Sequence, residues 1–154
     1  MDQSLNHFWK ISYGQIYPTL KQIVKEGLAT VDTLSEEGKP SRKEYYLTTK
    51  GKETLKDWLQ KPVEQVPVEK NEILLKLFFS RHQSNTNALS LINNYREKLE
   101  ENYQTYQNIE QMIANQKQNQ ADAKYWLFTL DYGKRVTKAA IEWCHATTTQ
   151  MNKG

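Results

Sequence analysis

The residues with the clearest chemical potential lie close together in one short segment, from Ser12 to Leu28. One side of this segment carries slim polar, aromatic and basic side chains: Tyr13, Gln15, Thr19, Lys21, Gln22 and Lys25. Amides and hydroxyls can bond to the edges of bases, and lysine ammonium groups bind phosphate. The segment therefore has side chains suited to contact with nucleic acid, although most amphipathic helices only pack against a core.

The same segment has the pattern of a helix spanning residues 12–26. Its apolar residues are spaced i, i+4, i+7 and i+8 and form one stripe: Ile16, Leu20, Ile23 and Val24. Ser12 and Gln15 have capping-box spacing, and Gly27 stands where a glycine commonly ends a helix. Pro18 removes one backbone hydrogen bond, which predicts a tight or kinked first turn and regular helix from Pro18 onward.

A basic hairpin is predicted directly after this helix. Residues 28–33 and 42–47 read as strands, and the turn segment SEEGKP separates them. Lys39, Arg42 and Lys43 lie at or near the tip. A charge cluster is usually only a solvated surface, but beside a recognition helix it suits a wing that contacts phosphate or the minor groove. Thr48 is a good N-cap for a further helix over 49–60.

The rest of the chain is predicted to be helical. Residues 62–70 contain two prolines and read as a linker between a domain of residues 1–61 and one of residues 71–154. Residues 71–81 are strongly apolar, which predicts burial on more than one side. Helices over 87–116 and 123–151 form an antiparallel pair in this interpretation. Their apolar stripes exceed what one partner needs, so we expect a homodimer.

Neither composition nor motifs point to an enzyme. His7, His82 and His145 are scattered, and no phosphate loop, dinucleotide fingerprint or nucleophile elbow occurs, so we expect no catalytic, metal or cofactor site. No apolar run approaches the roughly 20 residues of a membrane span, and Cys144 is the single cysteine. These features favour a cytoplasmic protein without a membrane contact. The net charge of +3 is too small to argue for nucleic acid by itself.

Two motifs resemble those of the PadR family of bacterial transcriptional regulators. The segment SYGQIYPTLKQIVKEGL, with Phe8 and Trp9 before it, is similar to the family's FW-x-x-S-Y-G-Q-I-Y-P-x-L-x-x-L-x-x-x-G-L, with Ile23 in place of a leucine. The segment RKEYYLTTKGKETL resembles the family's R-x-x-Y-x-L-T-x-x-G-x-x-x-L through Arg42, Tyr45 and the residues that follow. The first motif is specific, and the likeness of the C-terminal half rests on length and helical character.

The resemblance implies a mainly α fold with a small β-hairpin, namely a winged helix-turn-helix followed by an antiparallel helical dimerisation domain. It implies a homodimeric regulator, usually a repressor, that binds double-stranded DNA at a palindromic operator, and some relatives respond to small aromatic effectors. Base contacts would come from Tyr13, Gln15, Thr19 and Gln22. Phosphate contacts would come from Tyr17, Lys21, Lys25, Lys39, Arg42 and Lys43.

One departure from the family leaves alternatives open. The apolar first helix that precedes the FW motif in PadR-like chains has no counterpart here, so Ile16, Leu20 and Ile23 would be exposed unless another element covers them. One alternative is therefore a helical protein-interaction module with impaired DNA binding. Another is a ligand sensor with a pocket lined by aromatic residues. The candidates for that lining, for which ordinary core packing is the simpler role, are Trp58, Phe78, Phe79, Trp126 and Trp143.

Overall fold

A computed structural model of the chain describes residues 13–116 and 120–154. Contacts within the chain divide it into two units, Met1–Val68 and Glu69–Gly154. Phe8 and Trp9 of the first motif, the capping residue Ser12, and His7 lie outside the described residues. The boundaries predicted for the domains and for a linker over 62–70 stay a prediction, although residues 62–70 form no helix or strand.

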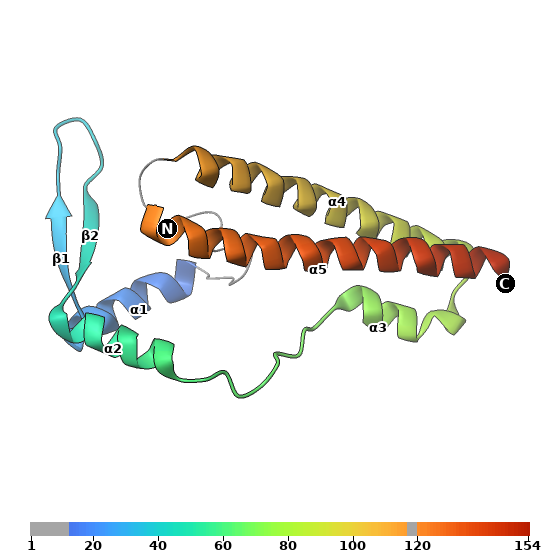
Figure 1. Ribbon diagram of the computed structural model, residues 1–154, viewed down its shortest axis with the longest axis horizontal. Coiled ribbons are helices and arrows are strands. Elements are labelled where there is room, and N and C mark those ends of the chain that lie inside the picture. Colours follow the sequence, from blue (N-terminus) through green and yellow to red (C-terminus); the bar gives the residue numbers. More distant parts are fainter. Residues whose placement is uncertain (1–12, 117–119) are drawn as a thin grey trace. The chain divides into compact units, whose positions relative to one another are not determined.

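The first unit has the winged-helix arrangement that the sequence predicts. Helix α1 (Tyr13–Lys25) is followed by the antiparallel strands β1 (Ala29–Leu34) and β2 (Arg42–Leu47) and by helix α2 (Thr49–Gln60). Ala29 lies opposite Leu47 and Leu34 lies opposite Arg42, so the register leaves residues 35–41 as the turn. Figure 1 shows the hairpin extending away from the ends of the two helices.

Helix α1 ends in a Schellman motif centred on a glycine. Gly27 has φ of +75°, and its N–H donates to the carbonyl of Val24 at 3.0 Å. The N–H of Leu28 reaches back to the carbonyl of Ile23, also at 3.0 Å. Because a side chain strains the left-handed region, glycine is the residue that ends this helix at least cost. The end of the helix thus follows the sequence prediction, whereas the helix itself continues through Pro18 from Tyr13.

Thr48 ties the two ends of the hairpin together. Its hydroxyl accepts a hydrogen bond from the N–H of Gly51, as the predicted N-cap of α2, and also donates to the carbonyl of Gly27 at 2.6 Å. Its own N–H donates to the carbonyl of Leu28. Gly51 is buried against that segment, and an added Cβ would lie 1.9 Å from the oxygen of Leu28. The start of α2 is therefore fixed to the end of α1 through backbone contacts.

The second unit consists of a long helix pair with a short helix beside it. Helix α3 (Glu72–Phe78) and a 3-10 turn (Ser80–His82) precede α4 (Asn85–Asn115) and α5 (Gln120–Lys153). Helices α4 and α5 pack along their length and run in opposite directions (Figure 1). Together with the winged unit, this confirms the predicted fold class.

The pair is joined by an apolar seam with a strict spacing of seven residues. On α4 the seam contains Ile92, Leu99, Tyr106 and Ile113, and on α5 it contains Leu130, Thr137, Cys144 and Met151. All are buried except Met151, which packs on the cluster of Ile92, Leu99 and Cys144 as a partly buried residue. Such a heptad seam is the packing of an antiparallel coiled coil. The predicted stripe on α4 is confirmed at its buried positions.

Two sequence expectations about burial are wrong for the single chain. Residues 71–81 are not buried on more than one side, because α3 has only seven residues and leaves Phe78 81% and Leu75 61% exposed. The apolar face of α2 is uncovered as well, with Trp58 66% exposed. In each case spacing finds the apolar residue, but burial depends on a neighbouring element that a short or outlying helix does not have.

Within the part of the chain that the structure describes, no helix is both long enough and apolar enough to cross a lipid bilayer.

Candidate nucleic-acid interface

Helix α1 presents an exposed polar stripe. Pro18, Lys21, Gln22 and Lys25 follow one another at i, i+3, i+4 and i+7, and all four are exposed. Among the described residues, neither lysine makes an ion pair, so both ammonium groups are available to phosphate. Tyr13 and Gln15 belong to the first turn of the helix. The structure describes the side chains of α1 from Ile16 onward.

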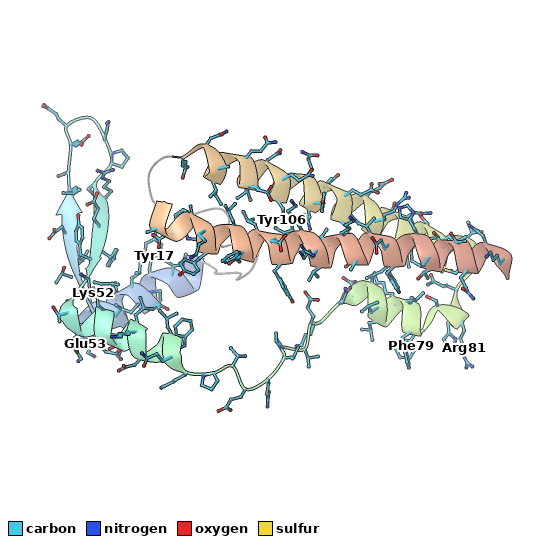
Figure 2. The ribbon with its side chains drawn as sticks, in the orientation of Figure 1. Tyr17, Lys52, Glu53, Phe79, Arg81 and Tyr106 are labelled. Carbon is cyan, nitrogen blue, oxygen red and sulfur yellow. The ribbon has the colours of Figure 1, made fainter. Side chains whose placement is uncertain are left out.

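The sides of this stripe are formed by one aromatic and one hydroxyl residue. Tyr17, labelled in Figure 2, is 61% exposed and lies one turn before Lys21. Thr19 is exposed on the other side. The opposite face holds the apolar stripe of Ile16, Leu20, Ile23 and Val24, and each of these is half-buried. Of the two outcomes left open for Ile16, Leu20 and Ile23, the structure therefore shows partial cover within the chain.

Gln22 has a competing partner on its own helix. Its Nε2 donates to Oε1 of Glu26 at 2.9 Å, on an exposed surface. A glutamine must present both its amide donor and its acceptor to read adenine. Gln22 therefore has to release Glu26 before it can contact a base in that way, and this exposed bond is weak enough to exchange.

The hairpin carries the predicted cations beside its turn. Arg42 and Lys43 are the first residues of β2 and lie opposite Leu34 and Thr33, at the end of the ribbon next to the turn. As neighbours in a strand they point to opposite faces, so each face of the ribbon has one cation. Lys39 lies within the turn segment. The predicted position at or near the tip is confirmed for all three.

Two of these cations are paired with carboxylates on the same hairpin. Lys39 Nζ lies 3.2 Å from Oε2 of Glu36, and Arg42 Nη2 lies 3.3 Å from Oε1 of Glu44. The side chains of both cations are more than two-thirds exposed, and exposed pairs are worth little, so a phosphate can compete for either group. Lys43 makes no ion pair within the described residues.

Glu44 also shapes the chemistry of a neighbouring tyrosine. The hydroxyl of Tyr46 donates to the carboxylate of Glu44, and this hydrogen bond raises the pKa of Tyr46 above its ordinary value of 10.0. Tyr46 is therefore a neutral hydrogen-bonding group at physiological pH. Its ring is half exposed, on the same face of the ribbon as Arg42.

Sequence reasoning overlooked two lysines at the start of α2. Lys50 donates from Nζ to the carbonyl of Glu26 at 2.9 Å, so it caps the end of α1 with positive charge. Lys52, labelled in Figure 2, is exposed on the first turn of α2. The alternation of lysines in the segment TTKGK was the signal that could have identified them.

The second unit has a groove whose lining includes one of the five aromatic candidates for a ligand pocket. A groove of about 450 Å³ between α3 and α4 is lined by Leu75, Lys76, Phe79, Gln83, Asn87 and Leu91. Of the five aromatic candidates only Phe79 is in this lining, and it meets Phe78 edge to face at 5.1 Å between ring centroids. Trp143 instead packs on the cluster of the heptad seam. Among the described residues, no three His, Cys, Asp or Glu side chains gather as metal ligands would.

Comparison with known proteins assigns both halves of the chain. Residues 1–57 match the family described as "Transcriptional regulator PadR-like family". Residues 69–152 match the family described as "Virulence activator alpha C-term". The curated "Negative transcriptional regulator PadR" of Bacillus subtilis (strain 168) is 34% identical over 96 residues, which cover 62% of this chain and 53% of that protein. This chain thus matches about half the length of that relative.

Two solved structures of Bacillus subtilis PadR share the fold. One is a complex with operator DNA, with a TM-score of 0.81 and 27% identity over 97% of this chain and 85% of that chain. The other is a complex with p-coumaric acid, with a TM-score of 0.77 and 26% identity over 97% of this chain and 84% of that chain. With the matched motifs and the winged-helix and helix-pair architecture, these findings lead to one conclusion: the chain belongs to the PadR-like family of transcriptional regulators.

Proposed function

We propose that this protein regulates transcription by binding double-stranded DNA as a homodimer, and that it acts as a repressor. The observation that carries the proposal is the exposed stripe of Lys21, Gln22 and Lys25 on α1, in the same unit as a hairpin with cations at its tip. The major groove admits an α-helix, so this side of α1 can face the bases. A two-stranded ribbon can follow the backbone or enter the minor groove. The PadR structure with operator DNA supports the same assignment by analogy.

In this proposal the residues divide into those that read bases and those that hold phosphates. Gln15, Thr19 and Gln22, with Tyr13, are the candidates for base contacts because they carry directional donors and acceptors. The phosphate contacts come from Tyr17, Lys21, Lys25, Lys39, Arg42 and Lys43. Phosphate contacts fix the register of a protein on DNA but carry no sequence information directly. We add Lys52 to the phosphate group, since it is exposed at the start of α2.

The homodimer is supported by apolar surface that the single chain leaves uncovered on the helical unit. Leu74, Leu75, Phe78 and Phe79 of α3 are each at least half exposed. A second exposed stripe on α5 contains Tyr125, Phe128, Tyr132 and Val136. Contiguous exposed apolar side chains mark interaction surfaces. A two-fold dimer would then require a palindromic operator with half-sites roughly 34–36 Å apart or a multiple of that spacing.

A salt titration tests DNA binding. Operator sequences are selected from a random duplex library, and binding is measured by fluorescence anisotropy at several salt concentrations. Replacing Arg42 and Lys43 by alanine should weaken binding to all duplexes by similar factors. It should also reduce the slope of log K against log salt by about two units, because each phosphate contact contributes close to one.

The matched control removes two cations from the helical unit. Arg135→Ala with Lys138→Ala, both exposed on α5, should leave the slope unchanged. If the wild-type protein selects no sequence and its weak binding disappears at moderate salt, DNA regulation is wrong. The exposed α2 face around Trp58 would then favour the alternative, a protein-interaction module.

A small aromatic effector is a second, compatible proposal. The groove between α3 and α4 is mainly apolar and has Lys76 in its lining, which suits an aromatic carboxylate. The PadR structure with p-coumaric acid supports this ligand class by analogy. Calorimetric titration with p-coumaric acid, with and without Lys76→Met, tests the site. Equal affinity of the two proteins would place the ligand elsewhere.

A further inference from the structure

One basic residue lies beside the seam between α4 and α5. Arg96 lies one turn after Ile92 and one turn before Leu99, next to two buried positions of the seam. The side chain is half-buried, and its Nε is fully buried without a hydrogen-bond partner in the described residues. Guanidinium groups in such positions normally have a carboxylate partner. Arg96 has no ion pair within the chain that the structure describes.

At the other end of the same helix pair, the corresponding position of α4 has an ion-pair partner on α5. Glu110 occupies the place on α4 two heptads after Arg96, and it accepts a hydrogen bond from Lys134 of α5 at 2.9 Å. Two heptads after Lys134 on α5 stands Thr148, whose hydroxyl already donates to the carbonyl of Cys144 at 2.9 Å. By this register Arg96 faces a threonine where Glu110 faces a lysine. By this register α5 therefore supplies no acid to Arg96.

Acidic residues nearby on α4 are also without partners. Glu97, Glu100 and Glu101 are exposed, and none of them makes an ion pair among the described residues. Glu100 lies one turn after Arg96 and on the same side of the helix. Even so, no bond joins these two side chains within the chain. One short stretch of α4 thus has an unpaired cation and an unpaired anion on one side.

This stretch of α4 has charges that are complementary to those of the same stretch in a second copy of the chain. In a two-fold symmetric interface, a residue i that contacts residue j of the other copy is matched by j contacting i. If two α4 helices cross in opposite directions near residue 98, Arg96 of each copy meets Glu100 of the other. We propose that Arg96 and Glu100 form two reciprocal ion pairs between two copies of this chain, and that these pairs set the register of the homodimer. The inference rests on the proposed homodimer and specifies where its two-fold axis passes.

The proposal gives a reason for keeping a charge beside an apolar seam. A polar residue at a single seam position can specify register and oligomeric state at some cost in stability. Arg96→Met should therefore leave the melting temperature of the dilute, monomeric protein unchanged or higher. The same substitution should weaken the dimer, because it leaves the carboxylates of Glu100 unpaired in the interface.

The experiment measures the dimer dissociation constant of the full chain by sedimentation equilibrium. Arg96→Met and Glu100→Gln should each raise that constant by about thirtyfold or more, the effect of truncating one member of a desolvated charge pair. The swapped protein, Arg96→Glu with Glu100→Arg, should recover most of the affinity. Arg96→Lys keeps the charge and should lose less than Arg96→Met does. Circular dichroism confirms that each variant retains its helices.

The control is Arg135→Met, which removes an exposed arginine paired with Asp131 on α5 and should change the dissociation constant less than twofold. A wild-type protein that stays monomeric at micromolar concentrations would refute the homodimer itself. A wild-type dimer that Arg96→Met leaves intact would refute only the ion pairs. A swapped protein no better than the single variants would also overturn the pairing of Arg96 with Glu100.

Discussion

Different kinds of interaction stabilise the two units of this chain. In the helix pair, Ile92, Leu130 and Cys144 are each at most 1% exposed and lie in a continuous apolar seam. In the described part of the winged unit, only Ala29 and Gly51 are buried. Its large apolar side chains are half-buried or exposed, while Thr48, Gly51 and Lys50 fix its backbone at the junction of α1 with α2. The winged unit thus depends on local polar contacts, and the helix pair depends on packing.

This difference follows from the length of the helices and from the side that each helix leaves polar. Under the proposed function, α1 has to keep one side polar in order to contact DNA. Helix α1 has thirteen residues, and the exposed stripe from Pro18 to Lys25 occupies one side of it. The α4 and α5 helices have 31 and 34 residues, and they can devote a full side to each other.

Truncating one aliphatic side chain in each unit tests the contrast most strongly. Ile92→Ala should lower the free energy of unfolding of the helix pair by about 2–5 kcal/mol, because it empties a fully buried position. Leu20→Ala in α1 should cost the winged unit clearly less, since Leu20 is only half-buried. Hydrogen exchange followed by mass spectrometry reports each unit separately.

Two results would change the comparison. Equal losses for the two variants would mean that the winged unit has a complete core around Leu20. No loss for Leu20→Ala would mean that this side of α1 is effectively exposed, which would favour the protein-interaction alternative over DNA binding. Val63→Ala, at a position 89% exposed in the segment after α2, is the neutral control.

The polar junction of the winged unit is tested by Gly51→Ala. The added Cβ would lie 1.9 Å from a backbone oxygen of Leu28, and a backbone atom cannot move aside as a flexible side chain can. We expect a loss of about 3 kcal/mol, at the upper end for overpacking, and faster hydrogen exchange in α2 and β1 but not in α4. Gly154→Ala, where a Cβ meets nothing within 4 Å, is the matched control. A protein with unchanged exchange would mean that this junction does not hold the unit together.

Local signals in the sequence were enough to place most of the elements. Strand β2 and helix α2 begin and end where the pattern predicts, because Thr48 is an N-cap whose function depends on its own neighbours. Gly27 ends α1 for the same kind of reason. Burial was harder to predict, since it depends on contacts between distant segments. The apolar run at residues 71–81 was therefore predicted to be buried, whereas several of its large side chains are exposed.

In the candidate site too, some features follow from local spacing in the sequence and others depend on tertiary packing. Exposure of Lys21 and Lys25 follows from helical spacing, and the position of Arg42 follows from the length of the hairpin. The contact of Gln22 with Glu26 and the cap that Lys50 forms on α1 depend on side-chain conformation and on tertiary packing. No periodicity in the sequence encodes those bonds. The roles of individual residues on DNA remain predictions for the salt titration to test.

The smallest expected effect concerns pH and the packed unit. Burial raises the pKa of the Cys144 thiol above its ordinary value of 9.0, more than the nearby Arg96 guanidinium lowers it. Below the ordinary value, the thiol is protonated in both the folded and the unfolded chain, and its contribution to stability is fully present. As the pH rises through the ordinary value, the unfolded chain releases its proton first, so stability falls until the folded pKa is passed.

Urea unfolding of the helix pair between pH 7.5 and pH 10 should therefore show a modest loss of stability at the alkaline end. Cys144→Ala should remove most of that loss, although it also lowers stability at every pH by emptying part of a buried site. Lys134, whose pKa is raised by its hydrogen bond to Glu110, loses its proton only at higher pH and contributes little in this range. The winged unit has no cysteine, so its hydrogen exchange, corrected for the intrinsic rate, should not follow this profile. If the stability of Cys144→Ala fell with alkaline pH as steeply as that of the wild-type protein, the thiol would not be desolvated in the seam. The packing of the helix pair would then differ less from that of the winged unit.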